Sequence, residues 1–317
     1  MSNSERLEDI ACDICGSAQQ TVIYKYSVNG DSINIVECKY CGCTYLCPRP
    51  KTHYLPEFYG ENYYSFRCDD ENNNLSSRGT KDTLRRTVMK HHFGYANIAA
   101  ADTLRIPPAV SILFKAFVAV PRYQQNGRLL DVGCGAGQKL QEFKSLGWDV
   151  RGVELSQQAA DEGRKMGLEI AAGSLYEAGW PAEYFTAITF YHSLEHLPSP
   201  RLALREAYRL MNHGGELLVV VPNFGCLERK LFGRNWGWLD VPVHLYHFTE
   251  ATLTRIISEA GFKIDTLGFS PGGCAASLSV FNGSKVARKV FENSVRLFGV
   301  ACAVAGSGKA LIVSARK

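Results

Sequence analysis

A glycine run between an apolar strand and a helix constrains this chain more than any other feature. The run LLDVGCGAG occupies residues 129–137, and the helical pattern QKLQEFKSLG follows it. Its three glycines carry no side chain, so a ligand can approach the backbone closely. They are Gly133, Gly135 and Gly137. Asp131 lies at the predicted end of the strand, where its carboxylate can meet a cation.

Strands and helices alternate from about residue 106 to about residue 270, which predicts an α/β domain with a doubly wound, mostly parallel sheet. The strands expected after the first are 149–155, 168–173, 186–192, 215–223, 262–269 and 309–317. A chain of 317 residues, 46% of them hydrophobic, can bury one large core and a small satellite domain. Ligands of such sheets bind beyond the carboxyl ends of the strands.

The second predicted strand ends in an acidic residue, Glu154, twenty-three residues after Asp131. A carboxylate in this place can accept hydrogen bonds from both hydroxyls of a ribose. A dinucleotide site is the rival interpretation, but its GxGxxG fingerprint needs a third glycine where this chain has Gln138. A glycine turn without any ligand is the plainer alternative.

The loop resembles the first motif (E/DxGxGxG) of class I S-adenosylmethionine (SAM)-dependent methyltransferases, and Glu154 in VRGVELS matches their ribose-binding acid. The stretches FTAITFYHSLEHLPSP and LMNHGGELLVVVPN resemble their fourth- and fifth-strand motifs. The resemblance covers residues 105–317 and implies a Rossmann-like seven-stranded sheet whose last strand is antiparallel. It assigns SAM binding to Asp131, Gly133, Cys134, Gly135, Gly137, Glu154, Leu155, Ser174, Leu175 and Tyr191.

SAM carries an electrophilic methyl group, so the enzyme mainly orients the reactants and supplies a base for a hydroxyl or a carbon acid. The catalytic candidates are Tyr191, His192, His196 and His244. His192 is the leading base, because imidazole titrates near neutral pH. The alternative is that Glu195 and His196 form a packing turn that supports the cofactor. Residues 192–196 also match the HxxEH zinc-protease motif, which needs a helix rather than this strand end.

Ubiquinone-pathway O-methyltransferases carry ExxEH at this place, which is implicated in divalent metal binding. This chain has His192 instead of the first Glu, which leaves metal dependence open. A second histidine pair lies in VPVHLYHFT, at 241–249. Four side chains of this region are candidates for one wall of the acceptor pocket: Trp236, Trp238, His244 and His247. Alternatively, His244 and His247 only anchor the following helix.

Two CxxCG knuckles, with twenty-two residues between Cys15 and Cys38, predict a zinc-ribbon-like module near the N-terminus. The expected ligands are Cys12, Cys15, Cys38 and Cys41. Four thiolates complete the tetrahedral shell of Zn²⁺, which makes the metal structural. Cys43 and Cys47 lie close enough along the chain to replace one ligand.

Three parts are expected: a zinc-binding module at 1–50, a linker or substrate-capping segment at 51–105 and the methyltransferase domain at 106–317. The combination resembles bacterial methyltransferases that act on nucleotide-linked or polymer-linked sugars, so the expected acceptor is a small molecule, sugar or glycan. By the same resemblance the tyrosines of the linker are candidate acceptor contacts. They are Tyr59, Tyr63 and Tyr64.

Other interpretations weigh charge and targeting. A net charge of +4 without a dense Lys/Arg patch, and FYHS in place of the [D/N]PPY/F turn of many RNA methyltransferases, argue against a nucleic-acid partner. The alternative of a non-catalytic zinc-ribbon protein with a vestigial SAM fold is disfavoured, because the glycine loop and Glu154 are intact. Residues 283–317 carry seven basic side chains and one acid, so the predicted helix 285–300 is a weak candidate for peripheral membrane contact. The polar N-terminus and CxxC pairs favour the cytoplasm, and no oligomeric state is indicated.

Overall fold

The computed structural model describes residues 6–58, 79–271, 294 and 297–317. The candidate acceptor contacts Tyr59, Tyr63 and Tyr64, and most of the stretch 285–300, lie outside these residues. Among the described residues, no helix has the length and apolar character needed to cross a membrane.

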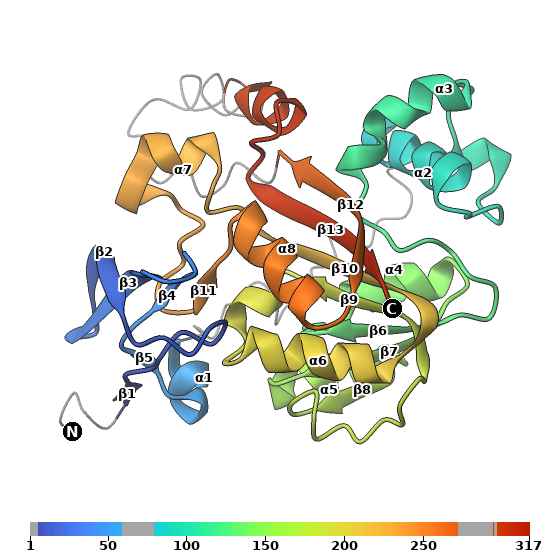
Figure 1. Cartoon of the computed structure of the whole chain (residues 1–317). Helices are drawn as coiled ribbons and strands as arrows, with labels where there is room; N and C mark the ends of the chain where they lie inside the picture. Colours follow the sequence, from blue (N-terminus) through green and yellow to red (C-terminus); the bar gives the residue numbers. More distant parts are fainter. Residues whose placement is uncertain (1–5, 59–78, 272–293, 295–296) are drawn as a thin grey trace.

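A seven-stranded sheet forms the centre of the molecule (Figure 1), in the order β12-β13-β10-β9-β6-β7-β8. Its strands are β6 (Arg128–Val132), β7 (Asp149–Glu154), β8 (Ile170–Ala172), β9 (Phe185–Tyr191), β10 (Met211–Pro222), β12 (Lys263–Ser270) and β13 (Ala310–Arg316). Strands β6 to β10 are parallel, whereas β13 runs antiparallel to both β10 and β12. The predicted seven-stranded Rossmann-like sheet with an antiparallel last strand is therefore confirmed.

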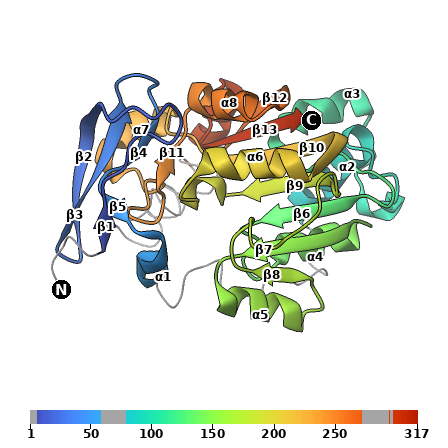
Figure 2. The same cartoon turned by 60° about the horizontal axis from the view of Figure 1, so that its bottom comes forward.

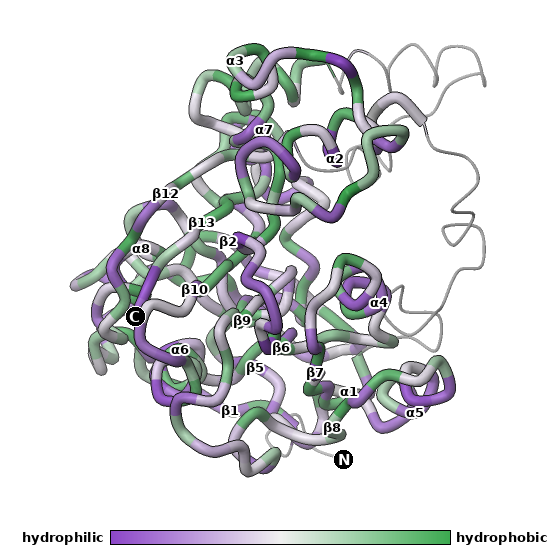
Figure 3. Tube along the Cα trace, turned by 90° about the vertical axis from the view of Figure 1, so that its right-hand side faces the viewer, coloured by the Kyte–Doolittle hydropathy of each residue, from purple (hydrophilic) through white to green (hydrophobic). Residues whose placement is uncertain are grey.

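Helices cover both faces of this sheet (Figure 2). On β6, Leu129 joins one apolar cluster and Leu130 the other, because successive strand residues point to opposite faces. One cluster includes side chains of α6 (Pro200–Leu210) and α8 (Glu250–Glu259). The other includes side chains of α2 (Thr80–His92), α4 (Gln138–Ser145) and α5 (Gln157–Lys165). Along α5, hydrophilic and hydrophobic stretches alternate in Figure 3, as expected of a helix with one buried face.

Polar side chains cap the starts of α6 and α8. The Ser199 hydroxyl accepts a hydrogen bond from the Leu202 backbone N–H, and Pro200 takes the first helical position of α6. Thr249 and Thr252 form a reciprocal capping box at the start of α8. Helix α6 ends at Leu210, because Met211 is buried and already pairs with β9.

The N-terminal module forms a small sheet that also includes a strand from the domain of the seven-stranded sheet. Its own strands are β1 (Leu7–Glu8), β2 (Gln20–Val28), β3 (Asp31–Cys38), β4 (Thr44–Leu46) and β5 (Arg49–Pro50). The four-stranded sheet has the order β11-β4-β3-β2, and β11 (Tyr246–His247) lies far along the chain. Tyr246 pairs with Tyr45, and His247 pairs with Thr44.

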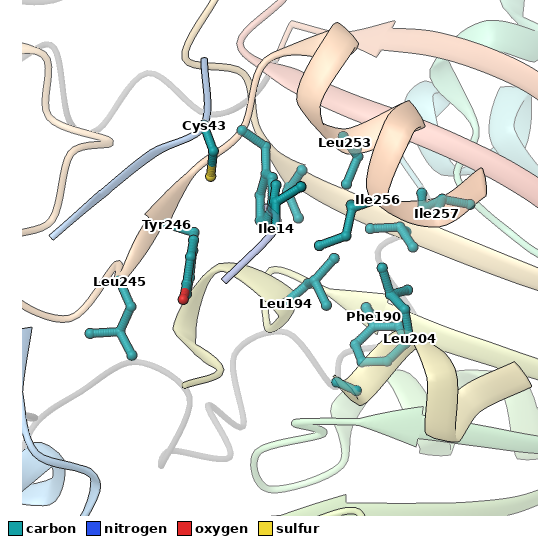
Figure 4. Packing of buried hydrophobic residues seen from close by; sticks show 14 of the residues in the cluster. Ile14, Cys43, Phe190, Leu194, Leu204, Leu245, Tyr246, Leu253, Ile256 and Ile257 are labelled. Carbon is teal, nitrogen blue, oxygen red and sulfur yellow. The ribbon is translucent and has the colours of Figure 1, made fainter. Parts of the chain in front are cut away.

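Side chains of the module also enter the main core. Figure 4 shows Ile14 and Cys43 near Tyr246 and Ile256, and all four side chains are buried. They belong to one continuous cluster that reaches Phe190 in the central sheet. The N-terminal module and the domain of the seven-stranded sheet therefore share one hydrophobic core.

Between the module and β6 the chain forms short helical pieces. They are η1 (Thr52–Tyr54), α1 (Leu55–Phe58), α2, η3 (Ala100–Asp102), α3 (Pro108–Ser111) and η4 (Ile112–Phe117). The pattern of the sequence gives no sign of α2, whose residues TKDTLRRTVMKHH are mostly polar. Among the side chains of α2 whose burial the structure describes, only Thr87, Val88 and Met89 are fully buried. After β9 and β10 come η5 (Leu194–His196), α7 (Leu227–Phe232) and η6 (Gly233–Asn235).

Candidate functional site

The glycine loop lies directly against the end of β7. The backbone N–H groups of Gly133 and Cys134 both donate to the Val153 carbonyl, at 2.8 and 3.2 Å. The Gly135 N–H donates to Glu154 Oε2 at 2.9 Å, and the Ser156 N–H donates to Glu154 Oε1 at 2.8 Å. The two strand ends that the sequence links to one ligand are therefore in direct contact.

Two of the three glycines in the loop make room for neighbouring side chains. A Cβ at Gly133 would lie 2.5 Å from Cβ of Ser193, and a Cβ at Gly137 would overlap the Leu168 side chain. At these two positions the missing side chain makes room for protein atoms rather than for a ligand, which differs from the sequence expectation. All three adopt positive φ, with Gly137 at 88° just before α4.

Asp131 is buried at the end of β6, with 2% of its surface exposed. Thr189 Oγ1 on β9 donates to its Oδ1 at 2.6 Å. Burial raises the pKa of the Asp131 carboxyl to about 7, and the Thr189 hydrogen bond and the charge of Lys139 offset only part of that effect. A cation bound beside Asp131 would favour its ionised form.

Three of the expected SAM-binding residues follow the ends of β7 and β8: Leu155, Ser174 and Leu175. The Gly173 N–H donates to the Glu154 carbonyl at 2.9 Å, which holds the two strand ends together. Leu155 is 51% exposed, whereas Leu175 is buried. Glu177, which sequence analysis missed, accepts a hydrogen bond from the Ser174 N–H at 2.7 Å. Cys134 is buried, and burial raises the pKa of its thiol, so it packs as a neutral side chain.

The candidate base His192 follows β9 and pairs with a buried acid. Its Nδ1 lies 3.5 Å from Oε1 of Glu195, and its ring lies 5.4 Å from that of Trp238. Burial raises the pKa of the Glu195 carboxyl, but the adjacent His192 and His196 side chains lower it by more, so the net shift is downward. An ionised Glu195 favours a proton on Nδ1 of His192, which leaves the Nε2 lone pair to accept one.

Two more histidines adjoin Glu195. The rings of His196 and His244 meet edge to face at 4.7 Å, and His244 Nδ1 lies 2.9 Å from the Trp238 carbonyl. Burial and the charge of His196 lower the pKa of His244 to about 3, so His244 is neutral at pH 7. Ligand atoms of Glu195, His196 and His244 all lie within 4.8 Å of one another. This trio can hold a divalent cation, and His192 is not part of it, so the geometry leaves metal dependence open.

The remaining members of the expected acceptor wall are mostly buried. Trp236 is 2% exposed and His247 is 3% exposed. The ring of His247 lies 5.4 Å from that of Phe224, and burial lowers the pKa of His247 to about 3. As a residue of β11, His247 pairs with Thr44 of β4.

The four expected metal ligands of the module converge. Sγ atoms of Cys12, Cys15, Cys38 and Cys41 all lie within 4.8 Å of one another. The pairs Cys12–Cys41 and Cys15–Cys38 are 3.4 and 3.5 Å apart, close to the roughly 3.8 Å edge of a tetrahedral Zn–S₄ centre. Cys43 is buried beside Cys12 but is not one of the four sulfurs that converge, and Cys47 donates to Asp9 and Ile10 instead.

The module contacts the segment that follows β9 through residues that sequence analysis missed. Asp13, inside the first knuckle, accepts hydrogen bonds from the Ser199 hydroxyl at 2.7 Å and the Arg201 N–H at 3.1 Å. Arg49 donates to the Pro198 carbonyl at 2.6 Å. Strand β4 also contributes, because the Leu46 N–H donates to the Leu245 carbonyl and the Leu245 N–H donates to the Glu195 carbonyl. The module thus fixes both ends of the segment that carries Glu195 and His196.

Comparisons with known proteins agree with this geometry. Residues 111–267 match the model of a methyltransferase domain family. Over 154 residues the chain is 31% identical to the ubiquinone biosynthesis O-methyltransferase of Thiobacillus denitrificans, covering 44% of this chain and 66% of that protein. Over 175 residues it is 27% identical to a probable S-adenosylmethionine-dependent methyltransferase of Mycolicibacterium smegmatis, covering 53% and 64%. The chain thus spans slightly under two thirds of these relatives.

A solved structure from Thermotoga maritima, a SAM-dependent methyltransferase described as a possible histamine N-methyltransferase, is 19% identical and covers 73% of this chain and 93% of that chain, with a TM-score of 0.47. The sheet order, the glycine loop with its acidic neighbour and the family match together define the class. Residues 111–267 therefore form a domain of the class I SAM-dependent methyltransferases.

Proposed function

We propose that this protein transfers the methyl group of SAM to an oxygen or carbon of a small-molecule, sugar or glycan acceptor. The observation that supports this most is the contact between the glycine loop and Glu154. Each Glu154 oxygen accepts one backbone N–H, which fixes the carboxylate. A carboxylate has about four acceptor positions, so two remain for the hydroxyls of a ribose.

The remaining cofactor candidates surround this point. Exposed Leu155 and the backbone of Ser174 suit the adenine side, and Asp131 suits the positively charged side of SAM. When bound, SAM supplies the electrophilic methyl group. The protein orients the acceptor and excludes water around it.

We assign proton transfer to His192. Its Nδ1 faces buried Glu195 at 3.5 Å, which leaves Nε2 to take the proton of an acceptor hydroxyl or carbon acid. Trp238, in ring contact with His192, and His244 beyond it suit the wall of the acceptor site. Neutral His244 can donate or accept a hydrogen bond but adds no charge.

The N-terminal cysteines are proposed to hold structural Zn²⁺. Four protein ligands leave no open position for substrate, and the distances suit Zn–S₄ geometry. The three-part organisation at 1–50, 51–105 and 106–317 belongs to the same proposal. A cytoplasmic location suits the nine free thiols, which are all the cysteines that the structure describes.

Calorimetry with SAM tests the core of this proposal. Wild type is expected to bind SAM, and Glu154→Ala is expected to lose roughly 10-fold or more in affinity, since two hydrogen bonds to a charged group are removed. Glu169→Ala, at an exposed carboxylate near β8, serves as the control and should bind normally. A wild-type protein that ignores SAM contradicts the proposal. Labelled SAM offered with nucleotide sugars, glycans, quinone precursors and RNA then identifies the acceptor class.

A further inference from the structure

A short helix near the end of the chain turns its large apolar side chains outward. Its described part, residues 297–304 and here called the C-terminal helix, reads LFGVACAV. The small side chains of Cys302 and Ala303 are buried against the protein. The large ones face solvent, since Leu297 is 73% exposed and Val304 is 72% exposed. A helix that only covers a sheet buries its large apolar side chains, so this arrangement suits a contact outside the chain.

Two other elements expose apolar side chains at the same end of the molecule. Of the fourteen large hydrophobic side chains that are exposed among the described residues, nine belong to the C-terminal helix, to α7 and to the α3–η4 segment. Figures 1 and 2 both show these three elements along the upper end of the molecule. The nine side chains are Val110, Ile112, Phe114, Leu227, Leu231, Leu297, Phe298, Val300 and Val304.

Contacts between the elements join these side chains into one surface. The Leu227 N–H, at the start of α7, donates to the Ser307 hydroxyl at 2.8 Å, just beyond the C-terminal helix. Strand β12 links that helix to η4. A Cβ on Gly268 of β12 would lie 3.1 Å from the Ala116 carbonyl oxygen in η4, and the ring of Phe269 lies against the turn after the C-terminal helix. The exposed side chains therefore adjoin, and we call their surface the apolar end surface.

Basic side chains accompany the apolar end surface. The segments that form it, 105–117, 226–235 and 297–309, contain one acidic residue, Glu228. Glu228 is 3% exposed, and its Oε2 lies 2.6 Å from Nζ of Lys309, which is also buried. The remaining charged side chains of these segments are exposed or half-buried, and all are basic: Arg105, Lys115, Arg229, Lys230 and Arg234. The exposed charge of this surface is therefore positive.

We propose that the apolar end surface binds the surface of a membrane that contains anionic lipids. Its Leu, Ile, Val and Phe side chains suit the boundary between headgroups and acyl chains, and its Lys and Arg side chains suit the lipid phosphates. A second copy of this chain fits less well, because a symmetric contact would bring the same basic side chains together. No described helix can cross a membrane, so the protein lies on the bilayer through this surface.

Co-sedimentation with vesicles tests the proposal. The full chain is mixed with vesicles of phosphatidylcholine alone or of phosphatidylcholine and phosphatidylglycerol. Wild type should bind the anionic vesicles, and high salt should weaken that binding because it screens the charges. The double variant Leu297→Glu/Val304→Glu should bind these vesicles about 10-fold more weakly or less, since charged side chains replace two inserted apolar ones. Lys230→Ala should weaken binding about fivefold, the usual effect of one basic side chain near an anionic surface.

Leu202→Glu is the matched control. Leu202 is 47% exposed on α6, in the lower half of Figure 1, and its variant should bind the vesicles as wild type does. Wild type that ignores anionic vesicles, or a folded double variant that binds them like wild type, would overturn the proposal. So would a concentration-dependent dimer in light scattering that the double variant abolishes while vesicle binding is absent. If the double variant has a lowered Tm, Lys230→Ala decides by its weaker binding alone.

Discussion

Replacing Asp131 by Asn should stabilise the protein without SAM and weaken its binding of SAM. Asp131 is 2% exposed, and burial raises its pKa from an ordinary 3.8 to about 7. The folded protein therefore holds this proton more tightly than the unfolded chain does. The contribution of the group to the free energy of unfolding is greatest below pH 4 and falls as the pH rises through about 7.

The size of the effect follows from these two values. At about 1.4 kcal/mol for each pH unit, the loss above pH 7 reaches a ceiling of about 4 kcal/mol. The amide side chain of the Asp131→Asn variant would stay neutral at every pH, and its oxygen can still accept the Thr189 hydroxyl. The stability advantage of Asp131→Asn over wild type should therefore grow by about 2–3 kcal/mol between pH 5 and pH 8.

Urea unfolding of both proteins at pH 5, 6, 7 and 8, without SAM, measures this difference. The control is Asp161→Asn at an exposed position of α5, which should show no such gain at high pH. Parallel pH dependences for Asp131→Asn and wild type would refute the argument. Calorimetry adds a second readout. The affinity of wild type for SAM should rise with pH towards pH 7, because the cations of SAM favour ionised Asp131, and the variant should lack that rise.

Three further predictions concern the base and the module. His192→Asn should lower kcat by about 10²–10⁴ and leave the Kd of SAM nearly unchanged, because Asn tolerates the positive φ of 51° at this position but cannot take up a proton. An unchanged kcat in stopped assays would show that His192 is not the base. Asp13→Ala should cost about 1–2 kcal/mol in urea unfolding, because the start of α6 loses an acceptor, whereas Glu37→Ala on the exposed face of β3 should cost little; equal losses would contradict the capping role. Purified protein should contain about one zinc per chain by elemental analysis, and chelation should lower the Tm; a metal-free protein of undiminished Tm would argue against a structural metal.

Local signals made the central fold predictable. Apolar runs, glycines after helices and a Ser-Pro helix start all act within a few residues, and they gave the strands and most helix ends. The contact between Gly135 and Glu154 was also predictable, because carboxyl ends of neighbouring parallel strands meet at one edge. The convergence of Cys12 with Cys41 followed from the spacing of the knuckles.

Contacts between distant parts of the chain could not be predicted in this way. Nothing near Asp13 reveals that it caps a helix 186 residues later, and nothing near Arg85 reveals that it pairs with Glu142 on α4. Helix α2 was not predicted, because a few buried side chains stabilise it by packing and its sequence shows no long apolar pattern. The environment of Gly133 depends likewise on Ser193, which a different strand delivers.

The strand β11 has a consequence for anyone who wishes to recombine such enzymes. A chain shortened to begin after residue 50 would leave Tyr246 and His247 without their β4 neighbours and would uncover the apolar side chains that Ile14 now shields. Exchange of N-terminal modules between related methyltransferases should therefore succeed only when residues 241–249 are exchanged together with the module. The exchangeable unit is a pair of segments rather than one contiguous block.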